Sequence, residues 1–196
     1  MSLVAHGHWT WGIGVLVAFD AYLREGELLR LTVADVVLPH CPRIGKVFSG
    51  RCGLFLGFTK TGRDKFVEVV RPEVIFLLTQ LVQVVRTTNS DPAAPLFSAT
   101  PSAFLRAFKA EARALGFDPR TVVHSCRHGG ATSDYLAGHS LEWIQHRGRW
   151  ASLKSATHYI QMGRALLMSS TAHIPQSSLD LATQVSANVI AYFTLA

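Results

Sequence analysis

Six side chains of this 196-residue chain have the types that are needed to handle a phosphate group. They are two guanidiniums, an ammonium, an imidazole, an indole N–H and a phenol: Arg24, Lys60, His124, Arg127, Trp150 and Tyr159. Four of them lie in one stretch, from His124 to Tyr159, in which the tyrosine follows the tryptophan by nine positions. The set therefore combines phosphate-binding groups with a nucleophile.

A phosphodiester resists attack because its anionic oxygens repel nucleophiles and its alkoxide is a poor leaving group. A protein can help by neutralising the charge of the transition state and by protonating the departing oxygen. Arg24 and Arg127 suit the first task, because a guanidinium stays charged and can donate two N–H groups to two phosphate oxygens. His124 can donate to another oxygen or shuttle the proton of the nucleophile, since the usual pKa of histidine is about 6.5.

The other three side chains can complete a reaction of cleavage and rejoining. Trp150 offers a neutral indole N–H for one hydrogen bond. Lys60 suits the protonation of the leaving oxygen if nearby cations lower the pKa of its amine. Tyr159 supplies a phenol, and a phosphodiester on that phenol keeps the bond energy for a reverse attack, so that strands are rejoined without ATP. Arg24 and Lys60 could also have no chemical role. Arg24 would then form a surface ion pair, and Lys60 would be a solvated residue of a turn.

The bulk composition indicates one globular domain with a polyanionic partner. Hydrophobic residues make up 48% of the chain and charged residues 16%, which excludes a chain that is disordered throughout. The net charge is +6, and residues 101–164 hold nine Lys and Arg against four Asp and Glu. We therefore expect a basic surface at the candidate site and a polyanion as its partner, with an inert basic surface as the alternative.

The cysteines and the amino terminus favour an intracellular protein. The three cysteines, Cys41, Cys52 and Cys126, are an odd count without a C-x-x-C spacing, which argues against a zinc knuckle and a secreted disulfide framework. The apolar run from Trp11 to Phe19 is too short to span a bilayer, and a signal peptide is not recognisable. We expect a cytoplasmic or nuclear protein without a membrane anchor.

The elements that must position the six residues follow from the apolar periodicity. It predicts helices over residues 9–23, 72–86, 101–115, 121–137 and 141–147. Residues 54–70 alternate as in a β-hairpin, with Lys60 to Lys65 as the turn and Gly62 where a positive φ is needed. The fold class is therefore mainly α with a small antiparallel β-hairpin or sheet.

The stretch that carries most of the candidate residues has its own helix signals. Thr121 is predicted to be an N-cap, which puts His124 and Arg127 on one face of the first turns. Gly129 and Gly130 suggest a close backbone approach in the same helix. A last helix is predicted to start at Ser152 and to carry Tyr159 on its third turn. Beyond it, one apolar stripe predicts a docking helix, in cis or in trans: Leu181, Val185, Val189 and Phe193.

These residues form motifs that resemble those of the tyrosine recombinase, or phage integrase, family. The motifs are R-x-x-E from Arg24 to Glu27, T-K-T-G from Thr59 to Gly62, H-x-x-R-H from His124 to His128, and a Trp nine positions before a Tyr. Their order and distances match the family over residues of roughly 10–165. The resemblance implies a catalytic domain over residues 1–165, followed by a tail over residues 166–196.

The resemblance also implies the roles of the residues and the partners of the chain. Tyr159 would attack a scissile phosphate of double-stranded DNA, giving a 3′-phosphotyrosyl link and a free 5′-hydroxyl. The phosphate contacts would come from Arg24, His124, Arg127 and Trp150, and the general acid would be Lys60. Members of the family recombine or integrate DNA, often for mobile elements, as tetramers on DNA and without a metal or other cofactor.

Two features depart from the pattern of that family. Most members have His at the position of Trp150, and a minority have Trp. The 196 residues also leave no room for the separate amino-terminal helical domain that usually completes the DNA clamp. We therefore expect this chain alone to bind DNA with weak sequence specificity.

Three other functions remain as alternatives. His124 and His128 are four apart and could bind zinc, but Ser125 stands where an H-E-x-x-H motif needs glutamate. A non-catalytic DNA-binding relic would keep the fold without the activity. A type IB topoisomerase-like activity would use the same tyrosine chemistry to nick and close DNA.

Overall fold

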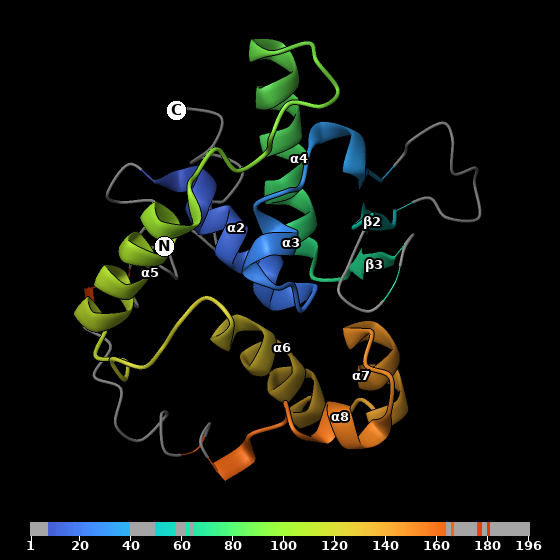
Figure 1. The fold of residues 1–196 in the computed structure, drawn as a ribbon, viewed down its shortest axis with the longest axis vertical. Coiled ribbons are helices and arrows are strands. Elements are labelled where there is room, and N and C mark those ends of the chain that lie inside the picture. Colours follow the sequence, from blue (N-terminus) through green and yellow to red (C-terminus); the bar gives the residue numbers. More distant parts are fainter. Residues whose placement is uncertain are drawn as a thin grey trace.

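The structure is a computed structural model, and it describes residues 8–39, 50–57, 62, 65–163, 166, 176–177 and 180. Its longer helices are α2 (Trp9–Asp20), α4 (Pro72–Thr88), α5 (Pro101–Ala114) and α6 (Ser125–Leu136). The shorter ones are α3 (Glu25–Leu28), η1 (Val33–Asp35), α7 (Leu141–Gly148) and α8 (Leu153–Thr157). The strands are β1 (Val36–Val37), β2 (Cys52–Phe55) and β3 (Phe66–Val69). The chain is thus mainly α with one small sheet, which confirms the predicted fold class (Figure 1).

The small sheet is antiparallel in the order β1-β2-β3. Leu54 of β2 pairs with Val67 of β3, and both side chains are buried, while their neighbours along each strand are more exposed. This alternation is the one that the sequence predicts for a half-buried hairpin. Gly62 has a φ of 140°. The rest of the predicted turn, including Lys60, lies outside the described residues.

The buried apolar side chains form two clusters. The larger one joins α2, α4, α5 and the sheet, with Val17, Leu54, Leu78 and Phe104 fully buried in it. The smaller one holds residues of α6, α7 and α8 with two neighbours: Tyr22, Ala131, Ile144, Trp150 and Ala156. In Figure 1, α6, α7 and α8 lie together on one side of α2, α3 and the sheet. The stretch from His124 to Tyr159 therefore builds most of the smaller cluster. We call the elements around the larger cluster the first tier and α6, α7 and α8 the second tier.

Two glycines of α6 allow this tier to approach the end of α2. A Cβ atom on Gly130 would lie 2.1 Å from the carbonyl oxygen of Phe19, and one on Gly129 would lie 2.8 Å from the Phe19 ring. Real side chains do not tolerate such distances, so a larger residue would push the two helices apart. The close approach predicted at the Gly129-Gly130 pair is confirmed.

A buried network of charges also joins the two tiers. Asp20 Oδ1 accepts hydrogen bonds from Arg71 Nη1 at 2.8 Å and from Arg147 Nη2 at 2.9 Å. Arg71 Nη2 donates to Asp134 Oδ1 at 2.7 Å, and the Tyr22 hydroxyl donates to Asp134 Oδ2. These residues come from α2, the turn after it, the start of α4, α6 and α7. We refer to the five residues as the Asp20 network.

Two predicted boundaries are wrong. Helix α6 begins at Ser125 with His124 as its N-cap residue, because the preceding turn closes through Val122 N–H donating to Ser125 Oγ at 3.2 Å. Thr121 is therefore not the cap. Helix α8 ends at Thr157, so Tyr159 follows the helix and does not lie on its third turn. The predicted docking stripe of the tail lies outside the described residues.

The described helices include none that is both long and apolar enough to cross a membrane.

Candidate active site

The ring of Tyr159 is in contact with several of the predicted site residues. Its centroid lies 4.7 Å from that of Trp150 and 5.8 Å from that of His124. The guanidinium carbon of Arg127 lies 5.4 Å from the same ring, and His128 stacks on it at 4.5 Å. Residues that are far apart in the sequence therefore meet around one phenol.

Short local structures position this cluster. His124 and Arg127 start α6, Trp150 lies in the turn between α7 and α8, and Tyr159 follows α8. The Tyr159 N–H donates to the Ala156 carbonyl at 2.9 Å, and the Tyr159 carbonyl accepts from the Thr132 hydroxyl at 3.4 Å. The backbone of the tyrosine is thus fixed at both sides against α8 and α6.

Arg127 is the most enclosed member of the cluster. Its side chain is 0% exposed, and its guanidinium carbon lies 4.6 Å from the Trp150 ring centroid. Nη2 donates to the Gly148 carbonyl at 2.5 Å, and Nη1 donates to the Tyr22 carbonyl. Gly148 has to be glycine here, because a Cβ atom would lie 1.9 Å from the Trp150 ring. The guanidinium is therefore held between main-chain carbonyls and aromatic rings.

Two buried N–H donors of the cluster have no acceptor within the described part of the chain. They are Nε of Arg127 and Nε1 of Trp150. Leaving a buried donor unsatisfied costs about 1–3 kcal/mol, so such atoms are rare and suggest a missing acceptor. A phosphate oxygen would be a suitable acceptor for both types of donor.

Arg24 is linked to Arg149 through the carboxylate of Glu27. It is the N-cap residue of α3, and Glu27 accepts from its backbone N–H at 2.9 Å and from its Nη1 at 2.7 Å. Nη2 of Arg149 donates to Glu27 Oε2 at 3.0 Å. The ion pair of Arg24 with Glu27 that the sequence suggests is confirmed, and it is part of a larger arrangement of charges.

The sequence prediction missed Arg149. Its side chain is 7% exposed and also donates to the carbonyls of Ala21 and Tyr22, at 3.2 and 3.3 Å. The only signal in the sequence is its position directly before Trp150. These three partners are more than 120 positions away along the chain, with 122 positions to Glu27, so spacing alone could not find them.

Burial and like charges set the proton affinities of the site. Burial, followed by the charges of Arg127 and Arg24, lowers the pKa of His124, which is therefore neutral at pH 7. Burial, followed by Arg149 and Arg24, lowers the pKa of Arg127 to about 10, so this guanidinium stays charged at pH 7. Burial alone would raise the pKa of Glu27, but the Arg24 N–H and the charges of Arg149 and Arg24 lower it overall.

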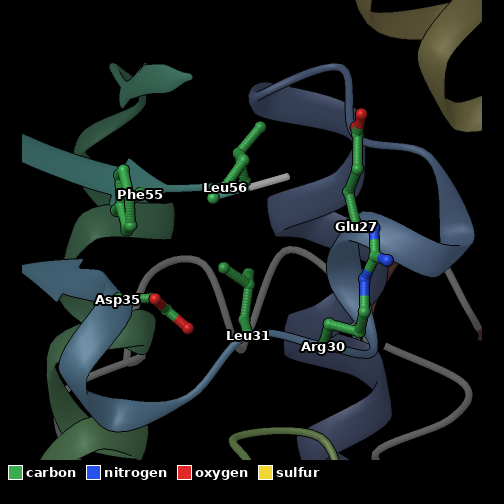
Figure 2. A pocket seen from close by; sticks show the side chains of 7 residues that line it. Glu27, Arg30, Leu31, Asp35, Phe55 and Leu56 are labelled. Atoms are coloured by element: carbon green, nitrogen blue, oxygen red, sulfur yellow. The ribbon is translucent and has the colours of Figure 1, made fainter. Parts of the chain in front are cut away.

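A pocket of about 210 Å³ lies next to Glu27, between the residues around α3 and the end of β2. Figure 2 shows Glu27 and Arg30 on one side, Asp35 and Phe55 on the other, and Leu31 and Leu56 between them. Small-molecule sites usually measure about 300–1,000 Å³, so this pocket is small for an organic ligand. The remaining predicted residue, Lys60, lies outside the described residues.

The expected basic surface at the site is only partly present. Eight of the nine basic residues in the range 101–164 are described by the structure, and three of these eight are turned inward: Arg127, Arg147 and Arg149, with side chains at most 8% exposed. Buried guanidiniums pair with carboxylates or carbonyls, because an unpaired buried charge is costly. Exposed positive charge remains at other positions, among them Arg106, Arg113 and Lys154.

No model of a known protein family and no curated protein matches this sequence. Solved structures that are similar to it in fold include two of one recombinase. One is the XerH site-specific recombinase bound to palindromic difH substrate in a post-cleavage complex, at a TM-score of 0.60 and 19% identity over 86% of this chain. The other is XerH bound to difH substrate in a pre-cleavage complex, at a TM-score of 0.61 and 19% identity over 83% of this chain.

The present chain spans 45% and 46% of the lengths of those two recombinase chains. The similarity extends over more than four fifths of this chain. The protein therefore has the fold of a tyrosine recombinase catalytic domain.

Proposed function

We propose that this chain cuts and rejoins DNA strands through a covalent 3′-phosphotyrosyl intermediate on Tyr159. Its partner would be double-stranded DNA, and the reaction would serve recombination or integration, as in a mobile element. The catalytic residues would be Arg24, Lys60, His124, Arg127, Trp150 and Tyr159, within a catalytic domain over residues 1–165 and inside the cell. The fold and the contacts of the Tyr159 ring support this proposal.

One observation carries the proposal. Beside the Tyr159 ring, Nε of Arg127 and Nε1 of Trp150 are buried N–H donors for which the described residues offer no acceptor. A site that binds an anion leaves such donors open until the anion arrives. Two N–H donors next to a phenol could hold the phosphate that the phenol attacks.

The proposed step can be written with all atoms accounted for. The Tyr159 oxygen forms a bond to phosphorus, the bond from phosphorus to the 5′ oxygen breaks, and Lys60 protonates that oxygen as it leaves as a hydroxyl. His124 is neutral at pH 7 and can donate to a phosphate oxygen or accept the proton of the phenol. Attack of a 5′-hydroxyl on the phosphotyrosyl link reverses the step and needs no ATP.

A non-catalytic DNA-binding relic is the second candidate, and one observation favours it. Both Nη atoms of Arg127 donate to carbonyls, and the side chain is fully buried under Trp150 and Tyr159. In an active enzyme this cluster must open when DNA binds, so that Arg127 can reach the phosphate. In a relic the same contacts would simply be part of the core.

A nicked suicide duplex separates the two candidates. Cleavage next to the nick releases a short fragment and traps the protein on the DNA, so an enzyme gives a covalent band in a denaturing gel. We expect this band for the wild-type chain, none for Tyr159→Phe, and a normal band for the matched control Tyr135→Phe, which alters an exposed tyrosine. A relic would bind the duplex and give no band in any of the three.

Two further assays address the finer parts of the proposal. Relaxation of a supercoiled plasmid without paired sites would indicate a topoisomerase-like activity instead of recombination. Recombination is expected to need a tetramer on DNA, which sedimentation of the protein with a duplex can detect.

A further inference from the structure

Arg149 has a backbone conformation that favours glycine. It follows α7 as the C-cap residue with a φ of 58°, in the left-handed region. Glycine is the usual residue at such a helix end, because a Cβ atom is strained there. Among the described residues, Tyr22 is the only other non-glycine residue with a positive φ, at 50°, and Arg149 Nη2 donates to its carbonyl at 3.3 Å. Two strained residues thus meet beside the candidate site.

The side chain of Arg149 makes contacts that a glycine at this position could not make. It reaches back from the end of α7 to the turn between α2 and α3, where it donates to the Ala21 carbonyl at 3.2 Å and to Glu27 Oε2 at 3.0 Å. Strained conformations of this kind tend to persist where function needs a particular side chain. The C-cap itself would need no side chain.

Arg149 is linked to both phosphate-binding arginines. Glu27 holds Arg24 by its backbone N–H and its Nη1, and Arg149 shares the charge of that carboxylate. The Tyr22 carbonyl accepts from Arg127 as well as from Arg149. The three guanidiniums and the one carboxylate carry a net charge of +2, with Arg149 contributing one of the positive charges.

We propose that Arg149 is a positioning residue for DNA cleavage, which holds Glu27 and the Tyr22 carbonyl so that Arg24 and Arg127 face one phosphate. This inference rests on the proposed function and adds to it a residue outside the six candidates. Without Arg149, the negative charge of Glu27 is balanced by Arg24 alone, so less positive charge remains for the transition state. Arg127 would also lose the neighbour that fixes the carbonyl it donates to.

Substitution by glycine distinguishes this role from helix capping. Arg149→Gly removes the backbone strain, so a residue needed only as a cap would leave the cleavage rate unchanged. As a positioning residue, its loss should slow adduct formation on the suicide duplex by about 100-fold in single-turnover conditions, as the loss of one transition-state contact does. Duplex binding should stay within about threefold, because the role concerns the transition state.

Two further variants keep the test decisive if the glycine variant does not fold. Arg149→Lys keeps the charge, and Arg149→Gln removes it with a similar length. We expect the lysine variant to form the adduct about tenfold faster than the glutamine variant, because an ammonium can still pair with Glu27. Equal rates in these two variants, or a wild-type rate in Arg149→Gly or Arg149→Gln, would overturn the proposal.

A double-mutant cycle with Glu27→Gln tests the route of the effect. If Arg149 acts through Glu27, adding Glu27→Gln to Arg149→Gln should have little further effect. The double variant should form the adduct at a rate within about threefold of that of the slower single variant. If the fold-reductions in rate of the two single variants multiply in the double variant, Arg149 acts independently of Glu27, which contradicts the proposal. A wild-type chain without any adduct would overturn the proposed function and this role with it, whereas an active wild type with an active Arg149→Gln would overturn this role alone.

Discussion

His124 is the N-cap residue of α6, and burial together with the charges of Arg127 and Arg24 determines its protonation. Burial is the largest cause of its lowered pKa, and the charges of Arg127 and Arg24 add to it, while Glu27 opposes them. A neutral imidazole adds no further positive charge to the site and can either donate or accept a hydrogen bond. This is the state in which His124 can serve both of the roles considered for it.

The lowered pKa predicts a dependence of stability on pH. In the unfolded chain His124 binds a proton near pH 6.5, whereas in the folded chain it binds one only at a lower pH. Below pH 6.5 the unfolded state therefore binds more protons than the folded state. The free energy of unfolding should therefore fall as the pH drops below 6.5, and His124→Asn should make this fall shallower. Urea denaturation at several pH values measures it.

A matched control for this prediction is His146→Asn, since His146 is an exposed histidine of α7. It should leave the slope of stability against pH as in the wild type. Parallel curves for the wild type and His124→Asn would show that the environment of His124 does not penalise its charged form.

At the scale of residues, spacing in the sequence was enough to select Arg24, His124, Arg127 and Trp150 with Tyr159. Their types and intervals form recognisable motifs. The structure brings His124, Arg127 and Trp150 to the Tyr159 ring, while Arg24 pairs with Glu27. Arg149 could not be selected in this way, because its role depends on a left-handed backbone and on a carboxylate 122 positions away. The motif of Lys60 falls outside the described residues, and its role stays a prediction.

At the scale of elements, the contact between α6 and the end of α2 positions Arg127 against Tyr22. The contact is possible only because Gly130 leaves room for the Phe19 carbonyl, which a Cβ atom would approach to 2.1 Å. The same approach lets the Tyr22 carbonyl accept a hydrogen bond from Arg127. The geometry of the site thus depends on a residue that has no side chain.

Gly130→Ala should therefore damage both stability and the site. The added methyl group meets backbone and cannot be relieved by turning a side chain, so we expect a loss of about 1–3 kcal/mol in the free energy of unfolding. Chemical denaturation measures this loss. Gly26→Ala is the matched control, because a Cβ atom there meets nothing within 4 Å, and it should change stability by less than about 0.5 kcal/mol. Similar losses in both variants would contradict the role of the close approach.

The element boundaries were harder to predict than the elements. Thr121 has the type of an N-cap, but its hydroxyl has no partner among the described residues, and the turn closes on Ser125 instead. Tyr159 was predicted within a helix because the apolar periodicity continues past Thr157, where α8 ends. Local propensity cannot decide such points, because packing against α6 determines where the chain leaves the helix.

At the scale of the whole molecule, the Asp20 network connects the two apolar clusters. Asp20 is 0% exposed, and its two carboxylate oxygens accept from Arg71, Arg147 and the backbone N–H of Val70, the last at 2.9 Å. Removing one partner of a buried charge network leaves uncompensated charges, which costs more than the network contributes. The relative position of the tiers, and with it the site, depends on these charges.

Asp20→Asn should accordingly destabilise the protein strongly. The amide keeps the shape but not the charge, so Arg71 and Arg147 would share Asp134 alone, and we expect a loss of about 3–5 kcal/mol in the free energy of unfolding. Chemical denaturation measures the loss against Asp118→Asn. That control alters an ion pair with Arg120, whose side chain is 86% exposed, and should cost less than about 1 kcal/mol. Equal losses would mean that the Asp20 network does not join the tiers.

Composition predicted a polyanionic partner but could not predict where the charges lie. The excess of basic residues in the range 101–164 predicted a basic surface, yet Arg127, Arg147 and Arg149 are used to hold the interior together. A sequence does not distinguish an arginine that pairs with a buried carboxylate from one that faces solvent. Only the fold determines which positive charges are available to a polyanion.

The central claim is that Tyr159 becomes covalently joined to a DNA strand, and mapping the attached residue tests it most directly. The wild-type chain would be incubated with the nicked suicide duplex and digested, and the nucleotide-bearing peptide identified by mass spectrometry. We predict a 3′-phosphate linked to the phenolic oxygen of Tyr159, together with a free 5′-hydroxyl on the released strand. A nucleotide on any other residue, or no attached nucleotide while the protein binds the duplex, would contradict the account.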